Sequence, residues 1–423
     1  MTLLKLPYGR STIEAEVPDR NLLAVVGPRE APATRSGEEE VKSALDNPAG
    51  SDRIEDIVER DHKVAVLVND ITRPAPTKTI LQELMFRLKK ARVRRSDITI
   101  VVATGTHRSS SRADLVETLG HEIVRDYEII DHNCHDAEKL IGLGKTKRGV
   151  PVKINKVVAQ SQVKILTGLI APHQAAGFSG GRKSVAPGVS GGDTIAMLHS
   201  FPIQPREPVM GMLSGNQFHE EIEEAAKIAG IGFIVNTVFN TERKIVGAFA
   251  GDLVEAWTKG TELCRRIYTA EVPHRAEIVV AVAGGYPRDI NLYQAQKAIA
   301  SAERVVTHGG AIILTARCEE GLGSGVYFEW LRQASRPEEV IERFEREAFT
   351  EGAMKAYFFA RALQRAKLSV VSDGLSCEQM REISIVKSGS LEEAVNAALD
   401  LTGPDAGILV LNHADELIPV LRG

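Results

Sequence analysis

The chain has 423 residues, of which 43% are hydrophobic and 26% are charged, and its formal net charge is −4. This composition is typical of a globular protein, and the small net charge excludes a chain drawn to nucleic acid or to an anionic membrane by its overall charge. No apolar run approaches the roughly 18 residues of a membrane span. The length favours two domains rather than one.

The four cysteines stand far apart and form no CxxC pair: Cys134, Cys264, Cys318 and Cys377. This spacing argues against a disulfide scaffold and indicates reduced thiols. The opening residues, MTLLKLPYGR, lack a charged start followed by a long apolar core, so we expect no secretory signal. A cytoplasmic protein is the expectation that follows.

In chain order, the polar residues 29–52 predict a helix start and a surface loop, and apolar runs predict strands at 63–70, 97–108, 161–173, 231–241 and 244–252. Residues 75–92 repeat apolar side chains on one helical face and predict a crossover helix. The basic run 87–95 is interpreted as the solvated end of this helix. Continuous apolar strands of this kind are typical of buried, largely parallel sheets covered by helices.

A second β-α-β series starts near residue 276 with AEIVVAVAGG and continues through NLYQAQKAIASAERVV, GGAIILTARCEEG, LSVVSDG and AGILVLNHA. The sequence therefore predicts an α/β protein with two lobes, each a largely parallel sheet flanked by helices, and an active site in the cleft between them. We expect an N-terminal domain at 1–270 and a C-terminal domain at 275–403, with a linker at 269–277. Residues 404–423 could pack back on the N-terminal domain.

Polar clusters occur where four of the predicted strands end: NDITRP (69–74), ATGTHR (103–108), APHQAAGFSGGRK (171–183) and GGYPRDINLYQ (284–294). In open α/β sheets, ligands bind beyond the carboxyl ends of the strands. Four strand ends with this character predict a functional site there.

The stretch GFSGGRKSVAPG (177–188) is close to the phosphate-binding loop GxxxxGK[ST], but Arg182 stands where a glycine must precede the lysine. Pro187 would also stop the long helix that such a loop must begin. A plain glycine-rich turn is an alternative. Five glycines around Arg182 and Lys183 instead favour a site for something anionic or large, since glycine lets the backbone approach a ligand closely.

Two histidines, His107 and His173, follow predicted strands and lie in polar loops. Histidine exchanges protons near neutral pH, so this pair suits a reaction that needs a proton donor or acceptor on each face of a substrate. For either residue alone, a hydrogen-bonded loop histidine is an equally good interpretation. His199 lies on a predicted helix, where a structural role is simpler than metal binding.

The run DHNCHD (131–136) contains metal-ligand types, but neighbours this close point in different directions, and no matching pair stands at zinc-site spacing elsewhere. His219 is interpreted as a helix-start residue with Asn216 as its cap.

Cations complete the set of candidate site residues. Arg73 directly follows a predicted strand, and Lys297 shares one helical face with Tyr293 and Gln294. Arginine and lysine are the usual partners of a carboxylate. Taken singly, each could be a surface cation.

Taken together, these motifs resemble the lactate racemase family, the nickel-pincer-nucleotide-dependent racemases and epimerases of 2-hydroxy acids. The resemblance covers nearly the whole chain, in order and spacing, from LPYGR through DITRP, GTHR, APHQAAGFSGGRKSVAPG and LHS to GGYPRDINLYQAQKA.

The resemblance implies a cofactor, a modified pyridinium mononucleotide that is covalently attached at Lys183 and holds nickel, with His199 as the protein ligand of the metal. It also implies that His107 and His173 are the acid–base groups on either side of the substrate. The residues implied to bind the substrate are Arg73, Tyr293, Gln294 and Lys297. Those implied to border the cofactor are Asp70, Thr72, Ser179 and Gly180.

The implied reaction interconverts the two configurations at C2 of a lactate-like, small aliphatic 2-hydroxy acid through a 2-keto acid, with the C2 hydrogen moving as hydride to the cofactor and back. The implied partners are this substrate and the cofactor-maturation enzymes, without which the protein would carry no cofactor; no nucleic acid or membrane partner is expected. Two other functions stay open, a nucleotide-dependent phosphotransferase that uses the glycine-rich loop and a non-catalytic carrier of a nucleotide or nickel cofactor.

Overall fold

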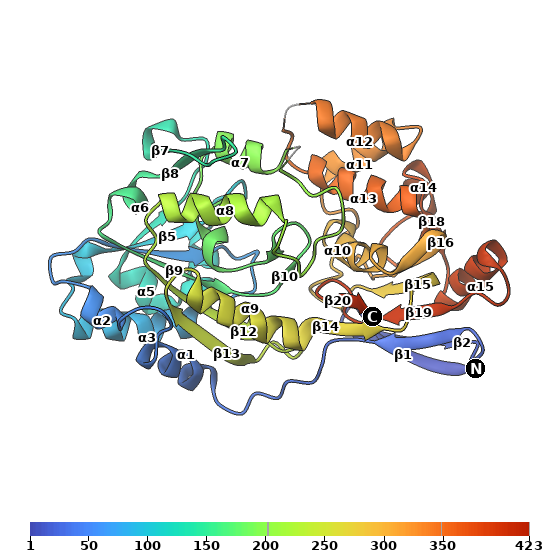
Figure 1. Cartoon of the computed structure of the whole chain (residues 1–423), viewed down its shortest axis with the longest axis horizontal. Helices are drawn as coiled ribbons and strands as arrows, with labels where there is room; N and C mark the ends of the chain where they lie inside the picture. The colour runs from blue at the N-terminus through green and yellow to red at the C-terminus, as the bar shows by residue number, and fades with distance from the viewer. Residues whose placement is uncertain (201–202, 348, 423) are drawn as a thin grey trace.

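A computed structural model describes residues 1–200, 203–347 and 349–422 and shows two α/β lobes side by side (Figure 1). Each lobe is built on one six-stranded sheet with helices packed against it. The fold class predicted from the sequence is therefore confirmed.

The first sheet has the strand order β13-β12-β9-β4-β5-β6. Its strands pair in parallel, apart from the edge pair β12–β13, which is antiparallel. Near-continuous runs of buried apolar residues form the central strands, as expected for a sheet covered on both faces. The bounds are β4 (Val64–Asn69), β5 (Ile98–Ala103), β6 (Glu128–Asp131), β9 (Val163–Leu169), β12 (Phe233–Phe239) and β13 (Ile245–Gly251).

The crossover helix α3 (Thr77–Lys90) joins β4 to β5 and buries its predicted apolar face. The prediction of a solvated basic run is wrong for Arg87, which is 3% exposed. Its guanidinium forms ion pairs with Glu83 (2.7 Å), Asp46 (2.8 Å) and Glu55 (3.1 Å). The acids come from α1 (Gly37–Asp46), α2 (Ile54–Ile57) and α3 itself, so tertiary packing supplies the partners that the local pattern does not reveal.

The second sheet has the order β18-β17-β16-β15-β19-β3, and all of its strands are parallel. The bounds are β3 (Leu22–Val26), β15 (Ala276–Val282), β16 (Val306–Thr315), β17 (Ala366–Val371), β18 (Val386–Ser388) and β19 (Ile408–Leu411). Although β3 comes from the start of the chain, it forms one edge of this sheet and pairs in parallel with β19. The hairpin of β1 (Thr2–Tyr8) and β2 (Ser11–Val17) packs on the same lobe, beside α15 (Leu391–Thr402). Strand pairing thus adds residues 2–26 to the second lobe, and the domain limits stay a prediction.

The two lobes are joined where a linker is predicted. There, β14 (Thr269–Val272) pairs in parallel with β20 (Ile418–Leu421), close to the C-terminus in Figure 1. Ile418 belongs to the hydrophobic core of the first lobe, whereas β19 belongs to the second sheet. The C-terminal segment therefore contacts both lobes.

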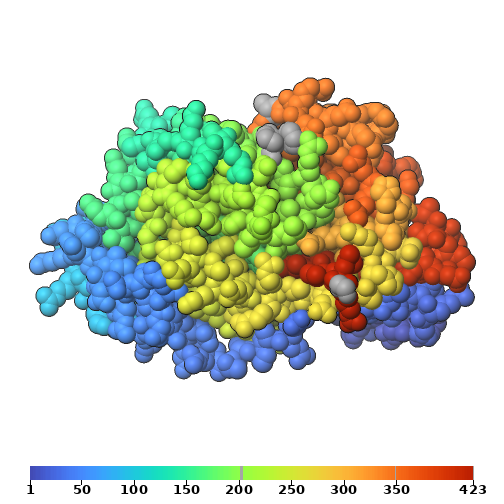
Figure 2. All heavy atoms as spheres, in the orientation of Figure 1, coloured from blue at the N-terminus to red at the C-terminus, as the bar shows by residue number. Residues whose placement is uncertain are grey.

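Further contacts join residues near 205–210 to the second lobe. Arg304 donates to the carbonyl of Met210 (2.8 Å), and Arg361 donates to that of Pro205 (3.1 Å). Figure 2 shows the atoms of the two lobes packed against each other along this boundary.

All four cysteines are free thiols, and only Cys377 is exposed. Within the described ranges, no helix has the length and apolar character that a membrane span requires.

Candidate active site

At the carboxyl end of β4, the buried Asp70 organises the loop that follows. Its Oδ1 accepts the backbone N–H of Thr72 (2.7 Å), and its Oδ2 lies 2.8 Å from Nδ1 of His107. Burial by itself raises the pKa of Asp70, but the hydrogen bond and charge of His107, with Thr72 and Arg73, outweigh it and lower the pKa overall. Asp70 is therefore a charged acceptor facing His107.

His107 is held in the loop after β5. Its backbone N–H donates to the carbonyl of Thr104 (2.9 Å). The backbone N–H of Gly105 donates to the carbonyl of Gly188 (2.9 Å), which joins this loop to the glycine-rich stretch. Nη2 of Arg73 lies 3.4 Å from Nε2 of the ring. Since arginine can only donate, Nε2 is the acceptor and Nδ1 carries the proton toward Asp70. His107 is thereby poised to accept a proton.

His173 has the opposite proton arrangement. It ends β10 (Pro172–His173), which pairs with β11 (Gly177–Phe178), and its Nδ1 accepts the N–H groups of Ala175 (3.2 Å) and Ala176 (3.1 Å). In the neutral ring, Nε2 must then carry the proton. Burial, followed by nearby cations, lowers the pKa of this histidine well below its usual value, so the neutral ring is the stable form; the cations are Lys183, Arg73, Lys297 and Lys355.

The glycine-rich loop folds into a single turn, η3 (Gly181–Ser184), and no long helix follows it. This confirms the prediction that it is not an ordinary phosphate-binding loop. Gly180 has φ +77°, and a Cβ there would lie 2.8 Å from Ile170 and 2.9 Å from Oδ1 of Asn236. That same Oδ1 accepts the N–H of Gly181 at 2.7 Å. Close packing on β9 and β12 thus fixes the backbone around Lys183.

The amino group of Lys183 lies 5.3 Å from the ring centroid of Phe218, on α8 (Gln217–Ile228). In the described part of the chain, this Nζ has neither an ion pair nor a hydrogen bond. Burial, with the charges of Arg73, Arg182 and Lys297, lowers the pKa of Lys183 to about 7. A lysine of this kind is a nucleophilic amine near neutral pH.

His199 lies at the end of α7 (Gly192–Leu198), next to the same aromatic ring. Its ring packs edge-on to Phe218 at 5.4 Å, so His199 and Lys183 share one neighbour. Its Nδ1 donates to the carbonyl of Ile195 (2.8 Å), which leaves the Nε2 lone pair free. Burial, with a smaller effect of the Lys183 charge, lowers the pKa of His199 to about 4. A neutral imidazole oriented through its other nitrogen is a competent metal ligand.

The predicted cofactor contacts Ser179 and Thr72 are engaged within the protein. The hydroxyl of Ser179 donates to Leu169 (2.8 Å) and accepts the N–H of Ala171 (2.9 Å), so it shapes the loop. Oγ1 of Thr72 lies 3.2 Å from Nδ1 of His107. Their contact with a cofactor, and that of Gly180, stays a prediction.

The second lobe contributes α10 (Leu292–Glu303), capped by Asn291. As predicted, Gln294 and Lys297 share a face, and Nζ of Lys297 donates to Oε1 of Gln294 (2.8 Å). Burial and then the charge of Arg73 lower the pKa of Lys297 to about 8, against the opposing effect of Asp415 and Glu416. An arginine of the first lobe therefore lies within electrostatic reach of a lysine of the second, and the site belongs to both lobes.

Two buried cations lie near the site without an individual role predicted from the sequence, which named Arg182 only as part of a glycine-rich anion site. Arg182 is 1% exposed, stacks 3.4 Å from the ring centroid of Trp257, and donates to Nδ1 of His219 (2.8 Å). Its Nε and Nη1 have no partner among the described residues. The capping prediction for His219 is confirmed, since Asn216 accepts its N–H at 3.2 Å. Sequence reasoning missed the other buried cation, Lys355, on α13 (Ala353–Arg365).

The run DHNCHD shows no metal-site geometry. Nε2 of His132 donates to the carbonyl of Ser190 (2.8 Å). Across the described ranges, no three His, Cys, Asp or Glu residues are grouped so that they could hold a metal ion.

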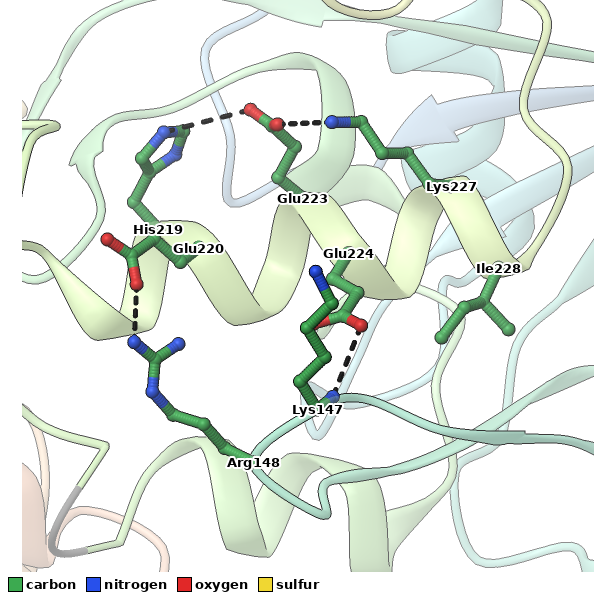
Figure 3. Close-up of a pocket in the computed structure, with 8 residues that line it drawn as sticks. All are labelled: Lys147, Arg148, His219, Glu220, Glu223, Glu224, Lys227 and Ile228. Carbon is green, nitrogen blue, oxygen red and sulfur yellow. Dashed lines mark hydrogen bonds and ion pairs between the residues drawn. The ribbon is translucent and has the colours of Figure 1, made fainter.

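A surface hollow of about 910 Å³ lies along α8 (Figure 3). Several of its charged side chains pair with one another, as Arg148 does with Glu220 and Lys227 with Glu223. None of the predicted acid–base or substrate-binding residues lines it; the lining residues are Lys147, Arg148, His219, Glu220, Glu223, Glu224, Lys227 and Ile228.

The fold and the site define a two-lobed α/β enzyme equipped for acid–base chemistry on an anionic substrate. Two family models match the chain, "Lactate racemase N-terminal domain" over residues 8–211 and "Lactate racemase C-terminal domain" over residues 272–418. The chain belongs to the lactate racemase family and is an isomerase of the racemase type.

Individual proteins agree with the family models. The chain is 30% identical to a lactate racemase of Thermoanaerobacterium thermosaccharolyticum over 417 residues, 97% of each chain. It is 33% identical to a lactate racemase of Lactiplantibacillus plantarum over 427 residues, 97% of this chain and 98% of the relative. The solved apoprotein of the Thermoanaerobacterium enzyme superposes with a TM-score of 0.94 at 29% identity and covers 100% of both chains. A Thermotoga maritima protein shares the fold at 16% identity, with a TM-score of 0.65 over 91% of this chain and 98% of its own.

Proposed function

We propose that this protein interconverts the two configurations at C2 of a 2-hydroxy acid, with lactate, which the names of its relatives specify, as a substrate. The observation that carries the proposal is the complementary proton state of His107, an acceptor at Nε2, and His173, a donor at Nε2. A reaction that inverts a carbinol centre needs one group to take the hydroxyl proton and another to return a proton when the opposite hand forms.

The substrate carboxylate is proposed to bind between Arg73 and Lys297, with Tyr293 and Gln294 beside it. Nε2 of His107 then takes the hydroxyl proton of one enantiomer. The Nε2 proton of His173 is delivered to the oxygen as the other enantiomer forms. The proton that His107 gained then passes to His173 through solvent, which restores both rings for the next turnover. In the reverse direction the same transfers run backwards, with His173 as the base and His107 as the acid.

The residues present fit the nickel-pincer nucleotide. Lys183 offers an unpartnered amine of lowered pKa for attachment, and His199 offers a free Nε2 beside the same phenyl ring. The chemistry that the group supplies when bound is reversible acceptance of the C2 hydrogen as hydride, with a 2-keto acid as the oxidised substrate. Asp70, Thr72, Ser179 and Gly180 are proposed to border it, and dedicated maturation enzymes are proposed to make it.

In this proposal, the N-terminal domain (1–270) carries the cofactor and the acid–base histidines. The C-terminal domain (275–403) supplies Lys297 and its neighbours for the substrate. Closing the two lobes over the substrate would exclude water from the oxidised intermediate.

The test is production of the protein with and without the maturation enzymes, followed by intact-mass and nickel measurements. Loaded wild type should carry an adduct on Lys183 and racemise lactate, and Lys183→Ala should carry none and be inactive. Wild-type racemisation by Lys183→Ala would overturn the proposal. An adduct without turnover of any 2-hydroxy acid would indicate a carrier, and magnesium-dependent ATP binding would indicate a phosphotransferase.

A further inference from the structure

Lys355 is a buried cation near the site to which neither the sequence motifs nor the proposed mechanism assigns a role. It is 4% exposed, and its Nζ donates to Oε1 of Gln296 (3.0 Å) and lies 4.9 Å from the ring centroid of Tyr293. Among the described residues, no carboxylate lies within ion-pair distance of it. Lysine is almost never fully buried unless it is paired, so this arrangement requires an explanation.

The surroundings of Lys355 disfavour a positive charge at this position unless an anion is bound nearby. Burial, and then the charges of Lys297 and Arg73, lower the pKa of Lys355 well below its usual value. The residue also lies in the first turn of α13, a helix without a capping side chain, where the helix dipole is positive. Gln296, its only hydrogen-bond partner in the described chain, is fully buried, and the Nε2 of that amide has no partner. Lys355 thus has only a neutral partner, and Nε2 of Gln296 has none among the described residues.

Comparison with Arg288, a partly buried cation, shows what is unusual about Lys355. Arg288 also lies near the junction of the lobes, but it pairs with Asp415 (3.0 Å) and with Glu416. Its charge is therefore neutralised within the protein. Lys355 has no such carboxylate partner among the described residues, and only the neutral amide of Gln296 contacts its amine.

The position of Lys355 places it on the substrate side of the site. Its two side-chain neighbours, Tyr293 and Gln296, are on α10, the helix that carries Lys297. The charges that act on the pKa of Lys355 are those of Lys297 and Arg73, the proposed carboxylate partners. These contacts connect Lys355 directly to the helix that carries Lys297, one of the proposed carboxylate partners.

We propose that Lys355, with the amide of Gln296, binds a second anionic group of the substrate, so that this enzyme prefers a 2-hydroxy acid that carries a carboxylate on its tail. The inference rests on the proposed function and extends it to the substrate class. Arg73 and Lys297 hold the carboxylate next to C2, and Lys355 receives the distal one. With a simple alkyl tail, the ammonium would keep only the neutral Oε1 of Gln296 as its partner and Nε2 of that amide would have none. This is costly, and the cost discriminates against lactate.

The test compares Lys355→Met, which keeps the length of the side chain and removes its charge, with Lys355→Arg, which keeps the charge. The loaded enzymes are assayed with malate and with lactate, and melting temperature and Lys183 adduct occupancy are recorded for each. Wild type should show a higher kcat/KM for malate than for lactate. Lys355→Met should lower kcat/KM for malate by about 10- to 100-fold, in line with the loss of a charge-assisted hydrogen bond, and leave lactate little changed or improved. Lys355→Arg should retain part of the preference for malate.

Three outcomes would overturn the inference. Equal losses with both substrates would place Lys355 at the shared carboxylate, and a loss of adduct occupancy would place it at the cofactor. If the wild type turned over lactate but not malate, the proposal that Lys355 binds a distal carboxylate would be refuted, while the proposed racemase function would stand. Failure of the wild type with every 2-hydroxy acid would instead refute the proposed function itself. Since Lys355→Met removes an unpaired buried charge, it should fold, and its melting temperature should equal or exceed that of the wild type.

Discussion

Oδ2 of Asp70 lies 2.8 Å from Nδ1 of His107, and Nη2 of Arg73 lies 3.4 Å from the other nitrogen of the same ring. The carboxylate holds the proton on Nδ1, and the guanidinium approaches the lone pair on Nε2. Three residues from two neighbouring strand ends thus fix which nitrogen can act as a base.

Asp70→Asn should therefore impair the acid–base step. The amide can present an N–H to Nδ1, which moves the ring proton to Nε2 and removes the acceptor. We expect kcat per loaded site to fall by about 10²- to 10⁴-fold, the usual contribution of general acid–base catalysis. A matched control is Asp131→Asn, at the end of β6, where the carboxylate accepts from Ser110. Equal activity of Asp70→Asn and wild type, at equal adduct occupancy, would contradict this role.

The lowered pKa of Lys183 predicts an amine that reacts at unusually low pH. With a pKa of about 7, it should reach half of its maximal acylation rate near pH 7 in the apoprotein, whereas ordinary lysines do so near 10.4. Peptide mass spectrometry after brief labelling across a pH series measures this directly. Labelling of Lys183 only above pH 9 would show that the neighbouring cations do not act as described.

Buried histidines predict a loss of stability in mild acid. Burial lowers the pKa of His199, His219 and His413 to about 4 and that of His173 well below its usual value. The unfolded chain then binds more protons than the folded chain below pH 6.5, so the free energy of unfolding falls as pH falls. Two carboxyl groups oppose this effect, since burial raises the pKa of Asp415 to about 7 and also raises that of Glu303. Urea denaturation should show the apoprotein at least ~1 kcal/mol less stable at pH 5 than at pH 7; equal or higher stability at pH 5 would contradict the account.

The ion pair of Arg361 with Glu303 supports the second lobe where it meets the first. The guanidinium contacts both carboxylate oxygens (2.7 and 2.9 Å), and both residues are buried. Arg361→Met leaves the carboxylate buried and unpaired, so it should cost about 3–5 kcal/mol in urea denaturation, and adding Glu303→Gln should recover much of that loss. The more exposed pair Arg343–Glu347 is the control, and Arg343→Met should cost less than about 1 kcal/mol. If both arginine substitutions lowered the free energy of unfolding by similar amounts, burial would not determine how much these ion pairs stabilise the protein.

Much of the fold could be predicted from the sequence, because buried parallel strands are continuous apolar runs and α3 shows its apolar face in its periodicity. The place of β3 could not, since its partner β19 lies nearly 400 residues away and nothing local specifies the pairing. The burial of Arg87 was missed for the same reason, because two of its three acidic partners come from other helices.

The site shows the same division. His107, His173, Lys183 and Lys297 stand in recognisable strand-end and loop motifs. The position of the ring proton on His107 depends on Arg73, and that on His173 depends on two backbone N–H groups. Only the folded chain brings these groups together and buries the residues of the site. Lys355, in the ordinary helical stretch AMKAYFF, has no local signal; only its contacts with α10 connect it to the site.

The most direct test of the central claim, inversion at C2 with the hydrogen moving as hydride, uses lactate labelled with deuterium at C2. Loaded wild-type enzyme is incubated with one labelled enantiomer in ordinary water. The product of opposite configuration is isolated by chiral chromatography, and its deuterium content is measured by mass spectrometry. The account predicts that the inverted lactate retains its deuterium, because a hydride held away from solvent does not exchange. Inverted lactate that has lost the label to water, or no inversion at all, would contradict it.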